Sequence, residues 1–130
     1  MDSIALVNED VEFGAEFLAD FGKAVPVNVA LWAKPAEASQ WYLYVASDQF
    51  GDANRDDGYR ELFRLADLHP HVDPFRVRLI SSDDPLAKLA LDVRRRFRDR
   101  PPMRFEDKLV GATFVEGAYV YPELPATSPA

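Results

Sequence analysis

Three stretches of the chain place apolar residues three and four positions apart, and this spacing predicts three helices. The first opens at Asn8-Glu9-Asp10, where a capping side chain and two acids suit a helix start, and Gly22 is expected to end it. His69-Pro70 ends the second, and the third opens at Asp84-Pro85, a carboxylate cap followed by a proline suited to the first helical position. The apolar faces consist of Val11, Ala15, Leu18 and Phe21 in the first helix, of Tyr59, Leu62, Phe63 and Ala66 in the second, and of Leu86, Leu89, Ala90, Val93 and Phe97 in the third.

Other stretches alternate apolar and polar residues every two positions, which is typical of strands. The strands predicted in this way span residues 26–33, 41–45, 75–81 and 113–121, and a short strand at 104–109 is expected to precede the last. The first two are separated by a polar turn and predict a hairpin. In the third, the alternation places Phe75, Val77 and Leu79 on one face and Arg76 and Arg78 on the other.

The elements follow one another in the order α-β-β-α-β-α-β, which predicts an α+β fold. We expect a mainly antiparallel sheet of four or five strands with about three helices packed against it. Residues 1–121 form a single domain in this interpretation. Residues 122–130 contain three prolines and little that can pack, so they are predicted to be a disordered, proline-rich tail.

The amino-acid composition excludes several classes of functional site. The 130 residues include no cysteine, which excludes disulfides, thiolate nucleophiles and cysteine-bound zinc. No apolar run approaches the roughly 20 residues that span a bilayer, and the first seven residues lack the features of a secretory signal. We therefore expect a cytoplasmic protein without a membrane partner.

The net charge of −7 is unevenly distributed along the chain. Residues 1–50 hold eight acids and two bases, whereas residues 88–108 hold eight bases and four acids. On the third helix, Arg94, Arg95 and Arg98 are expected to point outward, where arginine clusters bind phosphates or acidic protein surfaces. The same cations are also favoured by the dipole at a helix C-terminus, and they can pair with the acidic half of the chain.

Aromatic and arginine residues predict a second candidate surface. If the strand registers hold, one sheet face, turned away from Val29, Leu43 and Val77, carries Trp32, Tyr42, Tyr44, Arg76 and Arg78, joined by Tyr119 and Tyr121. Such a face suits a protein partner or single-stranded nucleic acid. In the alternative interpretation the N-terminal helix covers this face, and the aromatic residues belong to the core. A register slip of one residue also reverses the assignment.

Catalytic motifs are missing from the sequence. It has no Gly-x-Ser-x-Gly, no Ser-x-x-Lys, no phosphate-binding loop and no dinucleotide-binding glycine turn. The one histidine cluster, His69, His71 and Asp73, has ligand types that suit a metal but needs further carboxylates, such as Asp67. The sequence therefore favours a protein that is not an enzyme, and we expect no cofactor and assign no metal ligand.

Four segments resemble a set of small uncharacterised bacterial proteins, and the resemblance covers most of residues 27–122. The segments are Trp41-Tyr42-Leu43-Tyr44, Tyr59-Arg60-Glu61, residues 78–86 (Arg78-Leu79-Ile80-Ser81-Ser82-Asp83-Asp84-Pro85-Leu86) and Ala118-Tyr119-Val120-Tyr121-Pro122. The resemblance implies a bacterial or phage origin. It carries no known activity, so no functional residue is transferred from it.

Together these features predict a non-catalytic protein-interaction module of an accessory or regulatory kind. Its partner is either another protein or a second copy of the chain, which would make a homodimer. The first alternative is a nucleic-acid-binding protein that uses the arginine-rich helix end, although the overall acidity argues against it. The second is a small metal-dependent hydrolase built on His69, His71 and Asp73.

Overall fold

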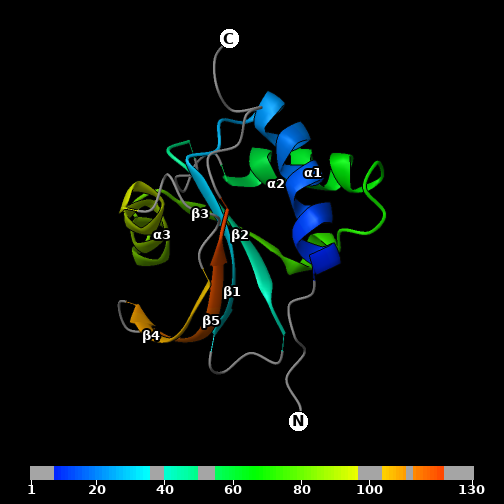
Figure 1. Ribbon diagram of the computed structural model, residues 1–130. Helices are drawn as coiled ribbons and strands as arrows, with labels where there is room; N and C mark the ends of the chain where they lie inside the picture. Colours follow the sequence, from blue (N-terminus) through cyan, green and yellow to red (C-terminus); the bar gives the residue numbers. More distant parts are fainter. Residues whose placement is uncertain (1–7, 36–39, 50–54, 97–103, 111–112, 122–130) are drawn as a thin grey trace.

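The computed structural model describes residues 8–35, 40–49, 55–96, 104–110 and 113–121 (Figure 1). Its helices are α1 (Asn8–Ala24), α2 (Arg55–Ala66) and α3 (Pro85–Arg96), with a short 3-10 helix, η1 (Pro74–Arg76). Its strands are β1 (Val29–Pro35), β2 (Tyr42–Ser47), β3 (Val77–Ser81), β4 (Arg104–Val110) and β5 (Thr113–Val120). The predicted tail at 122–130 and the predicted core residue Phe97 lie outside the described residues.

The five strands form one sheet in the order β3-β2-β1-β5-β4. β1 pairs antiparallel with β2 and with β5, and β4 pairs antiparallel with β5. β2 and β3 run parallel, because α2 carries the chain back across the sheet between them. The predicted α+β fold is therefore confirmed, with the sheet mixed and the short fifth strand present.

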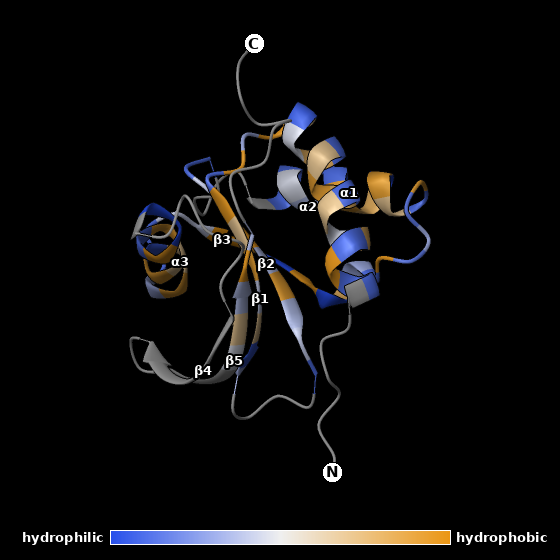
Figure 2. Cartoon of the chain, in the orientation of Figure 1, coloured by the Kyte–Doolittle hydropathy of each residue, from blue (hydrophilic) through white to orange (hydrophobic). Residues whose placement is uncertain are grey.

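The helices cover the sheet from both sides (Figure 1). α1 and α2 lie on one face, where Phe17, Leu18, Phe21, Leu62 and Leu65 are buried in a core shared with the sheet. α3 lies on the other face, where its small residues Ala87 and Ala90 pack on the sheet among Val29, Leu31, Ala33, Ala46, Ala118 and Val120. Figure 2 shows the apolar positions of the helices turned toward the sheet on both sides. We call these sides the α1 face and the α3 face.

Local sequence signals explain where α3 and β3 begin. The Asp84 carboxylate accepts a hydrogen bond from the Leu86 amide at 2.9 Å, which confirms the predicted cap of α3. The strand predicted from residue 75 begins two residues later, at Val77, because Pro74 and the Asp73 cap wind the chain into η1 first. Phe75 is consequently 79% exposed, and its predicted place on the buried face is wrong.

None of the helices within the described ranges is long and apolar enough to cross a membrane.

Candidate binding surface

The register of the β1–β2 hairpin divides the predicted aromatic face between the two sides of the sheet. Trp32 lies opposite Leu43, and Tyr44 lies opposite Leu31. Because opposite residues of paired strands share a face, Trp32 lies on the α1 face with Leu43, whereas Tyr42 and Tyr44 lie on the α3 face. The prediction that all three share one face is wrong, since their relative phase depends on the register.

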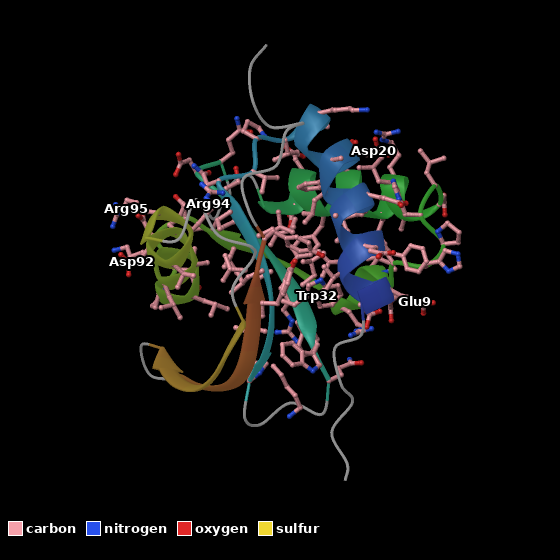
Figure 3. All side chains as sticks on the ribbon, viewed as in Figure 1. Glu9, Asp20, Trp32, Asp92, Arg94 and Arg95 are labelled. Atoms are coloured by element: carbon pink, nitrogen blue, oxygen red, sulfur yellow. The ribbon has the colours of Figure 1, made fainter. Side chains whose placement is uncertain are left out.

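Trp32 belongs to the core beneath α1, and Figure 3 shows it between the sheet and that helix. It is 5% exposed, and its Nε1 donates a hydrogen bond to Tyr121 Oη at 2.8 Å. Tyr121 Oη in turn donates to the carbonyl oxygen of Val11 in α1 at 2.7 Å. Burial raises the pKa of Tyr121 far above its usual range. For Trp32 and Tyr121, the alternative interpretation that α1 covers the aromatic residues is therefore confirmed.

Tyr42, Tyr44 and Arg78 remain together on the α3 face, and we call these three residues the Tyr42 surface. The Arg78 guanidinium lies 4.2 Å from the centroid of the Tyr42 ring, and Arg78 is exposed. The rings of Tyr42 and Tyr44 meet edge to face with centroids 6.5 Å apart. Hydrogen bonds from Gln40 and Arg78, together with the charges of Arg78 and Arg76, lower the pKa of the Tyr42 hydroxyl. Tyr44 is more enclosed, and burial raises its pKa.

Arg76 lies on the opposite side of the sheet from Arg78. Its guanidinium lies 5.2 Å from the centroid of the Trp32 ring, and its Nε donates a hydrogen bond to the carbonyl oxygen of Trp41 at 3.0 Å. The indole of Trp41 lies against Gly117, where an added Cβ would be 2.7 Å from its Cη2. The Nη2 atom of Arg76 is closed off from solvent and finds no hydrogen-bond acceptor among the described residues.

Arg76 and Arg78 differ from several other arginines of the chain in that they are not paired with a carboxylate among the described residues. Three arginines bond to a carboxylate three residues earlier on the same helix, namely Arg60 to Asp57, Arg64 to Glu61 and Arg95 to Asp92. Within the described part of the chain, neither Arg76 nor Arg78 enters an ion pair, and each lies on an aromatic ring instead. Among the described residues, the charge of each therefore lies beside an aromatic ring and not beside a carboxylate.

The arginine-rich end of α3 belongs to the helix that covers the α3 face. Figure 3 shows Arg94, Arg95 and Asp92 on α3, on the far side of the sheet from α1. Arg95 has a side chain that is 72% exposed, and its Nη2 lies 3.2 Å from Asp92 Oδ1. Arg94 is partly buried, and Arg98 lies outside the described residues. Arg95 therefore reaches solvent as predicted, but it is already paired within its own helix.

The histidine cluster serves the packing of α1. His69 Nε2 lies 2.8 Å from Asp20 Oδ2, and the His71 ring stacks on Phe13 with centroids 4.3 Å apart. Asp73 accepts a hydrogen bond from an amide of η1. Within the described ranges, no three histidine, aspartate or glutamate side chains are close enough to hold a metal. Each of the three residues thus has a structural partner of its own.

Two residues of interest escaped the sequence analysis as site residues. Trp41 was assigned only to a strand, yet its carbonyl fixes Arg76. Lys34 is 6% exposed in β1, two residues after Trp32 and on the same face. The burial of Lys34 could have been predicted, because it follows Ala30 and Trp32 at alternate positions of the strand. No local signal was available for Trp41, because its contacts come from β5 and η1.

Comparison with known proteins does not narrow the function. The chain matches no protein-family model, no curated protein and no solved structure. What the Tyr42 surface does is inferred from its own geometry.

Proposed function

We propose that the protein is a non-catalytic protein-interaction module of an accessory or regulatory kind, and that the Tyr42 surface contacts the partner. One observation carries the proposal. Arg78 is exposed and lies on the Tyr42 ring, and it has no carboxylate partner among the described residues. Tyrosine and arginine are the residue types that dominate binding energy at protein interfaces.

The geometry supports binding in two ways. Contact with the Tyr42 ring restricts the guanidinium of Arg78, so less conformational entropy is lost when a partner orders it. The unpaired positive charge selects for acidic partner groups, because a guanidinium binds a carboxylate through two parallel hydrogen bonds. The partner predicted from these properties is a protein segment that carries aspartate or glutamate beside an apolar side chain.

The partner is either another protein or a second copy of the chain. Self-association is supported by the charge distribution, since residues 1–50 hold six more acids than bases and offer carboxylates to the Tyr42 surface of a second molecule. The lack of cysteine and the resemblance over residues 27–122 support placing the module in the cytoplasm of a bacterium.

The test is selection from a phage-displayed library of random dodecapeptides on the folded protein, followed by affinity measurement with the enriched peptides. Three proteins are compared: the wild type, Arg78→Gln and the matched control Arg60→Gln. Arg60 is also exposed but is paired with Asp57 on α2. We expect enriched peptides rich in acidic residues, an affinity at least about tenfold lower for Arg78→Gln, and an unchanged affinity for the control. Sedimentation of the wild type and Arg78→Gln measures self-association in parallel.

Two results would remove the proposal. One is a selection that enriches no peptide over the heat-denatured protein, together with a strictly monomeric wild type. The other is binding that Arg78→Gln leaves unchanged. Mixed oligonucleotides at low salt form a further arm, in which binding that is weakened by Arg95→Gln but not by Arg78→Gln would favour the nucleic-acid-binding alternative.

A further inference from the structure

The Nη2 atom of Arg76 lacks what a buried donor requires. It is closed off from solvent and has no hydrogen-bond acceptor among the described residues. Buried polar groups in folded proteins are almost always hydrogen-bonded, and a cationic donor without a partner is especially costly. The rest of the guanidinium is held firmly, with Nε bonded to the carbonyl oxygen of Trp41 and the Trp32 ring 5.2 Å away.

We propose that Arg76 is a binding site for a carboxylate group of a ligand. The carboxylate accepts hydrogen bonds from the Nη atoms. The Trp41 carbonyl oxygen continues to accept from Nε and so fixes the orientation of the guanidinium. Arginine suits this role because its planar donors match the two oxygens of a carboxylate, and because the positive charge has no ion-pair partner within the described residues. Arg76 is only partly buried as a residue, whereas its Nη2 is enclosed, so a ligand that arrives from solvent must displace the group that covers this atom.

The walls of the site are held in place before a ligand arrives. Trp32 is fixed by its hydrogen bond to Tyr121 at 2.8 Å, and Tyr121 is fixed by its bond to the Val11 carbonyl of α1 at 2.7 Å. Trp41 is half-buried and lies against Gly117, whose missing side chain permits the close contact. Because these walls are already ordered, they lose little entropy when a ligand binds.

The site is separate from the Tyr42 surface, because Arg76 and Trp32 lie on the α1 face. The inference therefore does not rest on the proposed function, and each can fail without the other. A carboxylate on a partner protein and a small organic acid share the recognised chemistry, and the experiment distinguishes them.

The two tryptophans of the chain, Trp32 and Trp41, both contact Arg76, so tryptophan fluorescence reports on this site directly. Because Nη2 is enclosed in the free protein, an entering ligand must displace a covering group and change the emission. Three probes are titrated at constant ionic strength: glutarate, N-acetyl-triglycine with a free C-terminus, and an acetylated and amidated tetraglutamate. Sodium chloride is the reference. The proteins are the wild type, Arg76→Lys and the matched control Arg60→Lys.

We expect at least one carboxylate probe to give a saturable change in emission for the wild type and for Arg60→Lys. Arg76→Lys keeps the positive charge but loses the planar pair of guanidinium donors, so it should bind the carboxylate probe at least tenfold more weakly. Saturation by glutarate alone indicates a small organic acid, whereas saturation by a peptide probe indicates a partner chain. The absence of any saturable change in the wild type would overturn the inference and leave a bound water as the partner of Nη2. An equal response from Arg76→Lys would overturn it too.

A second measurement tests the Arg76 site in the wild-type protein, in case Arg76→Lys does not fold. In wild-type protein labelled with ¹⁵N, the side-chain Nε–Hε resonance of Arg76 should shift with the same probes and the same midpoint as the fluorescence. A fluorescence change during which that resonance stays still would also overturn the inference.

Discussion

Replacing Gly14 by alanine sets helix propensity against packing. Gly14 lies inside α1, where alanine is usually more stable than glycine by about 0.5–1 kcal/mol. A Cβ on Gly14 would lie well inside the contact distance of Tyr121 Oη and 3.2 Å from Trp32 Nε1. Tyr121 would have to move away, and the forced overlap costs about 1–3 kcal/mol.

The same movement breaks the hydrogen bond that satisfies Trp32 Nε1, a buried donor whose loss costs about 1–3 kcal/mol. Adding the two costs and subtracting the propensity gain leaves a net loss of about 1–5.5 kcal/mol, a large part of a small domain's stability. Urea denaturation followed by tryptophan fluorescence measures the change.

Tyr121→Phe provides the control, because it removes the oxygen that Gly14→Ala would meet. In the Tyr121→Phe background, Gly14→Ala should change the free energy of unfolding by less than about 0.5 kcal/mol or raise it, so the two changes are coupled by at least about 1 kcal/mol. A Gly14→Ala variant that is more stable than the wild type would refute the packing of α1 on Trp32 and Tyr121.

Three smaller predictions concern other parts of the fold. Asp84→Ala should lose the cap of α3 and about 1 kcal/mol of stability, and an unchanged urea midpoint would mean that the cap is not used. Hydrogen bonds from His69 and Lys23 lower the pKa of Asp20, so its stabilising effect is present above the unfolded value of about 3.9 and is lost as the pH falls through the lower folded value. Wild-type stability should therefore fall more steeply with acid than that of Asp20→Asn, and parallel stability curves would contradict the contact. Gly117→Ala in β5 should be destabilised by about 1–3 kcal/mol through overlap with the Trp41 indole, and a neutral result in thermal denaturation would contradict that packing.

Much of the fold follows from short-range signals. The helical spacings of α1 and α2 and the Asp84-Pro85 opening of α3 are local patterns, and all three helices form where these patterns lie, although Phe63 of the predicted α2 face is 44% exposed. The parallel pairing of β2 with β3 is different, because it depends on how α2 crosses the sheet rather than on any residue within the strands. The sheet is consequently mixed, although three of its four strand pairs are antiparallel, in agreement with the expected mainly antiparallel sheet.

The candidate surface was only partly predictable, for a reason that Trp32 and Tyr42 illustrate. Alternation correctly separates Trp32 from Val29 within β1, and Tyr42 from Leu43 within β2. It says nothing about which face of β1 matches which face of β2, because that phase is fixed by the hairpin register. The position of Arg76 was mispredicted for another reason. η1 interrupts the strand alternation before β3 begins, so Arg76 does not share the face of Arg78, and its guanidinium lies over the Trp32 ring.

The most direct test of the proposed function is to map where an enriched peptide binds. In a ¹⁵N-labelled sample, saturating peptide should shift the Arg78 side-chain Nε–Hε resonance and the backbone amides of β2 and β3. Amides at the C-terminal end of α3 around Arg94 and Arg95 should stay in place. Shifts confined to that end of α3, with the Arg78 resonance unmoved, would contradict binding at the Tyr42 surface and transfer the binding role to the basic helix.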